Sequence, residues 1–294
     1  MTLRAQASKI YYGFKKEAAK ITYNKKIDGP DYLSSDMLKQ LDSKYTYDNK
    51  VFYDFDNNMA RAKERYIFMR DKFEGFGKSL KGADVLELGC GDGLICALMN
   101  DNGSKSAAID LDNSLFDQYA TDRDVKYYTM DAANLTFPDS AFDFIFSHNG
   151  FEHFGDPAAV LNECKRVLRP GGIMYFQFNP MYYSPFGYHA YKSIAIPYMH
   201  ILFSQKDFTK YASENGRPAI VTDPSFLNRK TVSYFRNLFR DSKDKRFREL
   251  YYLEETNYYF VDFIRKYPSC FKKENVSFED FITSGIRLWM QRIS

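Results

Sequence analysis

The feature that most constrains this chain is an apolar run that ends in three alternating glycines. Residues 83–88 read Ala-Asp-Val-Leu-Glu-Leu, and Gly89, Gly91 and Gly93 follow at every second position. Glycine reaches positive φ without steric cost and lets a ligand approach the backbone closely. The apolar residues 94–99 then favour a helix. We therefore expect a buried strand, a glycine turn and a helix N-terminus, which together form a nucleotide-type binding site.

Apolar segments alternate with helical ones along much of the chain. Short strands are expected over residues 83–88, 107–112, 125–130, 142–147, 173–178, 247–253 and 286–290, and a helix over 157–168. This alternation predicts an α/β fold with a mainly parallel sheet and helices on both faces. Asp110 follows Gly91 by 19 positions and lies near the end of its strand. A carboxylate at that place binds the two hydroxyls of a ribose in such folds.

Composition excludes several classes of protein. The chain has 294 residues, of which 45% are apolar, so one large domain with an insertion is expected. A net charge of +3 does not demand a polyanionic partner. The four cysteines lack CxxC spacing, which predicts neither a disulfide framework nor a zinc site. With no apolar run long enough to span a bilayer and no signal peptide, we expect a cytoplasmic protein.

Two regions lie outside the strand-rich core. Residues 1–80 show helical patterns, and the first helix places Ile10, Phe14 and Ile21 near one face, with lysines elsewhere. We expect this face to pack on the protein, although a basic amphipathic helix also suits a membrane surface. An insertion over about 181–227 follows the strand 173–178, beside the carboxyl ends of the strands. It is expected to form a substrate lid.

Several motifs occur in a characteristic order. They are Glu87-x-Gly89-x-Gly91-x-Gly93, Asp131, Leu135-x-Phe137-Pro138-Asp139, Phe142-Asp143, Glu152-His153 and Arg166-Val167-Leu168-x-Pro170-Gly171-Gly172. In this order they resemble the class I S-adenosylmethionine (AdoMet) methyltransferases of the small-molecule branch, which includes ubiquinone and sterol methylases. The insertion resembles, more loosely, methyltransferases of bacterial polysaccharide gene clusters. The resemblance implies a seven-stranded Rossmann-like sheet, with an N-terminal helical cap (1–80) and a methyltransferase domain (81–294).

The resemblance also implies which residues bind AdoMet. Glu87 and the backbone at Gly89 and Gly91 would hold the methionine end, and Asp110 the ribose. Asp131 would accept a hydrogen bond from the adenine amine, with the backbone of Ala132 on the ring. The end of the fourth strand would face the sulfonium. The remaining expected cofactor-binding residues are Cys90, Gly93, Leu111, Ser147 and His148.

Three histidines are candidate catalytic residues. His153 follows the fourth strand and is the candidate general base for an acceptor hydroxyl, with packing in the loop as the alternative. His189 and His200 lie in the insertion, where they could orient a substrate phosphate or take a proton. A metal site needs a third ligand near them, and we expect none.

These residues predict AdoMet-dependent O-methylation, or less favourably N-methylation, of a small polar acceptor such as a sugar or glycan precursor. The acceptor could carry phosphate or a lipid. The alternatives are a nucleic-acid or protein N-methyltransferase, suggested by Asn179-Pro180-Met181-Tyr182, and an AdoMet-binding protein without catalysis. A nicotinamide-dependent dehydrogenase fits less well because its third glycine lies one position later.

Overall fold

The computed structural model describes residues 3–45, 54–223, 225–240 and 246–294, and it divides the chain into two compact units. The helical unit comprises residues 1–49, 179–237 and 254–286. The sheet unit comprises residues 50–178, 238–253 and 287–294. The division differs from the predicted boundary at residue 80, because the third helix belongs to the sheet unit and the insertion joins the N-terminal helices.

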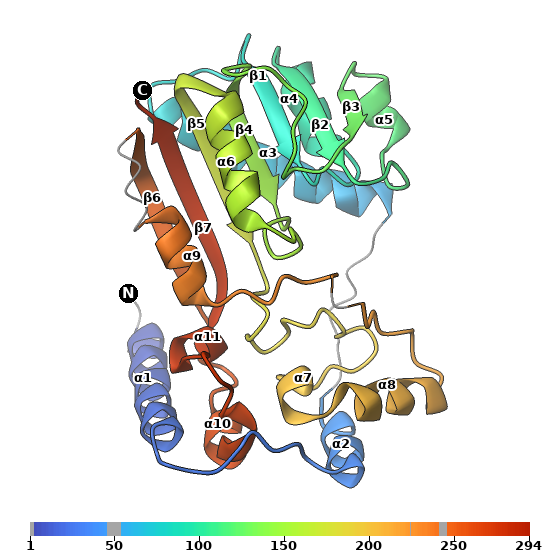
Figure 1. Cartoon of the computed structure of the whole chain (residues 1–294), viewed down its shortest axis with the longest axis vertical. Coiled ribbons are helices and arrows are strands. Elements are labelled where there is room, and N and C mark those ends of the chain that lie inside the picture. Colours follow the sequence, from blue (N-terminus) through green and yellow to red (C-terminus); the bar gives the residue numbers. More distant parts are fainter. Residues whose placement is uncertain (1–2, 46–53, 224, 241–245) are drawn as a thin grey trace. The chain divides into compact units, whose positions relative to one another are not determined.

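A seven-stranded sheet carries the fold (Figure 1). The strands are β1 (Asp84–Leu88), β2 (Lys105–Asp110), β3 (Lys126–Thr129), β4 (Phe142–His148), β5 (Leu168–Phe178), β6 (Phe247–Thr256) and β7 (Thr283–Arg292). Their order is β3-β2-β1-β4-β5-β7-β6, and the β1–β2, β1–β4, β2–β3 and β4–β5 pairs are parallel. This arrangement confirms the predicted Rossmann-like fold.

Helices of the sheet unit cover the sheet as the sequence pattern predicts. They are α3 (Phe55–Gly75), α4 (Leu94–Asp101), α5 (Gln118–Thr121) and α6 (Pro157–Val167). The apolar side of α3, which includes Met59, Tyr66 and Phe73, is buried. Central strands such as β4 are buried on both faces, as parallel strands between helical layers must be. In the core, Trp289 of β7 stacks on Tyr175 of β5, with ring centroids 4.3 Å apart.

The helical unit has its own apolar core. Its helices are α1 (Leu3–Tyr23), α2 (Ser35–Asp42), α7 (Met199–Leu202), α8 (Gln205–Glu214), α10 (Asp262–Lys266), η1 (Pro268–Phe271) and α11 (Phe278–Ile282), and α9 (Val232–Phe239) begins in it. Tyr198, fully buried, donates a hydrogen bond to the carbonyl oxygen of Phe281 (2.8 Å). The insertion therefore packs with segments from both ends of the sequence.

The predicted inward face of α1 is wrong. Ile10, Phe14 and Ile21 are exposed, whereas Ala19 is fully buried. Lys15 instead pairs with Asp262, and this ion pair holds α1 against α10. None of the helices within the described residues is long and apolar enough to cross a membrane.

Candidate cofactor site

The glycine turn after β1 has the backbone that its sequence demands. Gly89, Gly91 and Gly93 have φ values of 66°, 53° and 71°, in the left-handed region. The N–H groups of Gly89 and Cys90 both donate to the carbonyl oxygen of Ile109, at 2.9 and 3.1 Å. The end of β2 thus fixes the turn that follows β1.

Gly91 and Gly93 meet different surroundings. A Cβ atom added at Gly91 would have no heavy atom within 4 Å, so the space beside it is open to a ligand. One added at Gly93 would lie 2.3 Å from the ring of Phe116. The Gly93 N–H already donates to the carbonyl oxygen of Cys90 (3.1 Å). Gly93 therefore serves the packing of the turn, and Gly91 has the surroundings expected of a ligand contact.

We predict that Gly93→Ala destabilises the sheet unit by about 2–4 kcal/mol, because a methyl group at positive φ also overlaps Phe116. Urea unfolding measures the change. Gly82→Ala is the control, since Gly82 also has positive φ (81°) but no neighbour within 4 Å. Equal losses for the two variants would show that the contact with Phe116 does not matter.

Glu87 of β1 is a buried carboxyl whose charge is suppressed. Burial raises its pKa to about 8, Asp92 adds to the rise, and the Cys96 thiol and Arg65 oppose it. The thiol of Cys96 donates to Glu87 Oε2 over 3.2 Å. A buried carboxyl of this kind gains a strong partner when a cation arrives. The ammonium group of a bound methionine moiety is such a cation.

We predict that binding of S-adenosylhomocysteine, the demethylated product of AdoMet, releases a proton from Glu87. The free protein holds Glu87 protonated below pH 8, so affinity should rise between about pH 6 and 8, by up to tenfold per unit, and then level off. Titration calorimetry in two buffers of different ionisation enthalpy measures both effects. Glu87→Gln should remove the pH dependence, and a flat profile for the unmodified protein would contradict the role of Glu87.

Asp110 ends β2 and uses both of its oxygens. Oδ2 accepts from the Gly91 N–H (2.9 Å) and Oδ1 from the Leu111 N–H (2.8 Å). Each carboxylate oxygen has a second lone pair, so a ribose diol can still bind. Leu111 is 71% exposed beside it and offers apolar surface for a flat ring. The structure thus brings together Gly91, Asp110 and Leu111, three of the residues expected to bind AdoMet.

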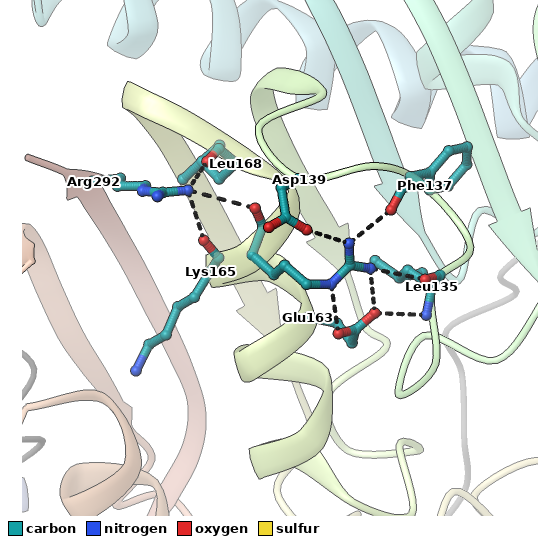
Figure 2. A network of polar contacts seen from close by, with 8 residues as sticks. Leu135, Phe137, Asp139, Glu163, Lys165, Leu168 and Arg292 are labelled. Carbon is teal, nitrogen blue, oxygen red and sulfur yellow. Dashed lines mark hydrogen bonds and ion pairs between the residues drawn. The ribbon is translucent and has the colours of Figure 1, made fainter. Parts of the chain in front are cut away.

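The loop after β3 contains the predicted adenine contacts. Asp131 is exposed and accepts from the Ala133 N–H (2.9 Å), and Ala132 is buried. Arg166 of α6 holds the loop that follows (Figure 2). Its guanidinium donates to the carbonyl oxygens of Leu135 and Phe137, both at 2.8 Å, and it pairs with Asp139 and Glu163. Glu163 also accepts from the Leu135 N–H (2.8 Å).

We predict that Arg166→Gln weakens binding of S-adenosylhomocysteine several-fold, because the loop that carries Asp131 loses its attachment to α6. Arg169→Gln is the matched control. Arg169 also bridges two carboxylates, Asp84 and Asp143, but these lie at the starts of β1 and β4. Calorimetry and thermal unfolding separate the outcomes: both variants should lose stability, and equal loss of affinity in both would refute a specific role for Arg166.

The end of β4 places polar groups next to the turn. Ser147 is fully buried and donates to the carbonyl oxygen of Leu88 (2.9 Å), so its hydroxyl joins β4 to β1. His148 is 8% exposed, and its ring lies near the side chain of Gln177. Burial, reinforced by the charges of Arg65 and Arg287, lowers its pKa to about 3. His148 is therefore a neutral imidazole, which does not repel a sulfonium.

The candidate catalytic histidines lie in different units. His153 belongs to the sheet unit, in a turn in which its N–H donates to the Gly150 carbonyl oxygen (2.8 Å). His189 and His200 belong to the helical unit. His200 is buried, and its Nε2 lies 2.6 Å from the carbonyl oxygen of Tyr182, which can only accept a hydrogen bond. Burial lowers the pKa of His200 to about 3, and these surroundings indicate a structural role.

Arg65 is a candidate site residue that the motifs do not reveal. It lies on α3, more than 20 positions before the glycine turn, and its charge lowers the pKa values of Glu87, Asp92 and His148. The only feature of the sequence that points to Arg65 is its spacing from Phe68, three residues later, which places both residues on the same face of the helix. Phe68 contacts Tyr175, and Tyr175 contacts His148. Packing of α3 on the sheet is therefore what brings Arg65 to the site.

Comparison with known proteins supports this assignment. Residues 86–176 match a family described as a methyltransferase domain. Over 117 residues the chain is 32% identical to a probable S-adenosylmethionine-dependent methyltransferase of Mycolicibacterium smegmatis (38% of this chain, 45% of that protein). It is 31% identical over 103 residues to a ubiquinone biosynthesis O-methyltransferase of Coxiella burnetii (33% and 44%). A malonyl-[acyl-carrier protein] O-methyltransferase of Serratia marcescens is also 31% identical, over 107 residues (36% and 42%).

The chain spans less than half the length of these relatives. Among solved structures, a putative sarcosine dimethylglycine methyltransferase from Galdieria sulphuraria has a TM-score of 0.51 at 15% identity, covering 87% of this chain and 97% of that one. That likeness concerns the fold alone. The seven-stranded Rossmann-like sheet and the glycine turn after β1 are together characteristic of the class I AdoMet-dependent methyltransferases. Residues 86–176 of this chain are similar to a methyltransferase domain, and AdoMet is the cofactor of that class.

Proposed function

We propose that the protein transfers the methyl group of AdoMet to a small polar acceptor. The observation that carries the proposal is the grouping of Glu87, the open side of Gly91 and the Asp110 carboxylate at the carboxyl ends of β1 and β2. Glu87 suits the ammonium of the donor and Asp110 its ribose diol, and the open side of Gly91 lets the donor lie against the backbone. AdoMet supplies an electrophilic methyl on a sulfonium, and the protein's task is alignment and exclusion of water.

The chain's own residues have separate tasks in this proposal. Arg65 binds the carboxylate of the methionine end, and Glu87 its ammonium. Asp131 and the Ala132 backbone bind adenine. Phe154 shields the transfer region from water, since its ring lies 3.9 Å from a Cβ atom built on Gly89. His153 is the proposed base for an acceptor hydroxyl.

The proposed acceptor is an oxygen of a sugar or glycan-type precursor. O-methylation is supported by the names of the ubiquinone and malonyl-[acyl-carrier protein] relatives. The choice of a sugar as acceptor is supported only by the looser resemblance of the insertion to methyltransferases of bacterial polysaccharide gene clusters. Asn179-Pro180-Met181-Tyr182 follows β5, whereas β4 ends in His148, so the sequence that suggested a base-flipping methylase is not at the end of the fourth strand.

We predict that Asp110→Ala weakens S-adenosylhomocysteine binding by about 1–3 kcal/mol, because the ribose diol loses its acceptor. Asp112→Ala is the matched control, since Asp112 is an exposed acid in the same segment whose side chain bonds only to Ser114 among the described contacts. Calorimetry measures both variants. Unchanged affinity in Asp110→Ala, or no binding by the unmodified protein at millimolar ligand, would overturn the proposed function. Label transfer from methyl-labelled AdoMet into fractionated small molecules then identifies the acceptor.

A further inference from the structure

Helix α1 presents apolar side chains to solvent and lysines to the protein. Ile10, Tyr11, Phe14 and Ile21 are 61%, 54%, 75% and 64% exposed. The Lys15 ammonium, 4.8 Å from the ring centre of Tyr11, pairs with Asp262, and Lys20, farther around the helix, lies 3.4 Å from Glu279. The distribution is the reverse of that in an ordinary surface helix, whose apolar side is covered. An apolar face of this size on one helix indicates a binding surface.

The exposed residues form one continuous stripe. At 100° per residue, Tyr11, Ala18, Phe14, Ile21 and Ile10 follow one another around the helix over an arc of about 100°. Phe14 lies near the middle of this arc and is its most exposed member. Glu17 lies at one edge. We call Ile10, Tyr11, Phe14, Ala18 and Ile21 the apolar stripe.

A groove continues the apolar surface on one side of the stripe. It has a volume of about 940 Å³ and lies within the helical unit, between α1 and residues 255–259. Tyr259, 65% exposed, lies on its wall, and its ring centroid is 6.1 Å from that of Tyr12. The Lys16 ammonium lies 5.4 Å from the ring centre of Tyr258. Tyrosine and lysine around an apolar surface are typical of the boundary between hydrocarbon and water.

Charge identifies the occupant of this surface. Residues 1–26 contain seven Lys and Arg and one acidic residue, Glu17. The helical unit as a whole has 20 Lys and Arg against 15 Asp and Glu, whereas the sheet unit has 21 against 23. A cluster of basic residues on an amphipathic helix is attracted to anionic lipid. A second copy of the chain would bring two such clusters together, and like charges oppose that contact.

We propose that α1 docks the protein on an anionic membrane surface, with the apolar stripe in the interfacial layer and the exposed Lys25 and Lys26, which follow the helix, toward the lipid head groups. The helix lies on the membrane and does not cross it. This inference rests on α1 and its surroundings alone and does not depend on the proposed methyl transfer.

Sedimentation with vesicles tests the proposal. The protein should bind vesicles of equal parts phosphatidylglycerol and phosphatidylcholine, bind vesicles of phosphatidylcholine alone far less, and dissociate as salt is raised. Phe14→Ser with Ile21→Ser should lower the partition coefficient about tenfold or more, because both apolar anchors are lost. Lys25→Glu with Lys26→Glu should lower it as well and should reduce its dependence on salt.

The control is Ile67→Ser with Val221→Ser, which removes two other half-exposed apolar side chains (46% and 50% exposed) and should leave vesicle binding unchanged. Circular dichroism and S-adenosylhomocysteine binding confirm that each variant is folded. Failure of the unmodified protein to sediment with anionic vesicles would overturn the proposal. So would a stripe variant that keeps its vesicle binding, or one whose only change is from dimer to monomer in light scattering.

Discussion

The bonds from the end of β2 to the glycine turn determine the character of the site. Ile109 and Asp110 accept hydrogen bonds from three successive N–H groups, those of Gly89, Cys90 and Gly91. In the first turn of α4, the Leu94 N–H also has an acceptor within the protein, Asp92 Oδ1 (3.1 Å). A pyrophosphate needs such N–H groups free and no acid beside them. The turn therefore suits a ligand that brings hydroxyls and a cation, which separates this site from a dinucleotide site.

Local sequence was sufficient for the parts of the fold that depend on local rules. The buried strands β1, β4 and β5 follow from their apolar runs, and Asp110 from its position at a strand end. Why position 93 requires glycine could not be predicted from the sequence. The ring of Phe116, 23 residues later, leaves no room for a Cβ atom there. The orientation of α1 was predicted wrongly for the same kind of reason. Its hydrophobic pattern shows which side is apolar, but the inward side is decided by Asp262, far along the chain.

The domain division could not be predicted for a related reason. Residues 1–49, 179–237 and 254–286 share one core, and a sequence pattern contains no signal for the pairing of such distant segments. His200 shows the consequence for the candidate site. Its place in an aromatic insertion favoured a functional role, whereas its surroundings are a buried carbonyl group and the ring of Tyr188 (5.6 Å between centroids). Arg65 is the opposite case, a functional candidate in a helix whose sequence suggested packing only.

The network in Figure 2 explains how residues outside the matched stretch 86–176 support the donor site. Arg292, in β7, donates to the carbonyl oxygens of Lys165, Arg166 and Leu168 where α6 ends and β5 begins. These carbonyls are among the groups that a helix leaves unsatisfied at its C-terminus. The end of α6 also carries the Arg166 side chain, which holds the loop at Leu135 and Phe137. The last strand thus fixes the end of a helix, the helix fixes the loop, and the loop holds Asp131 at the edge of the sheet.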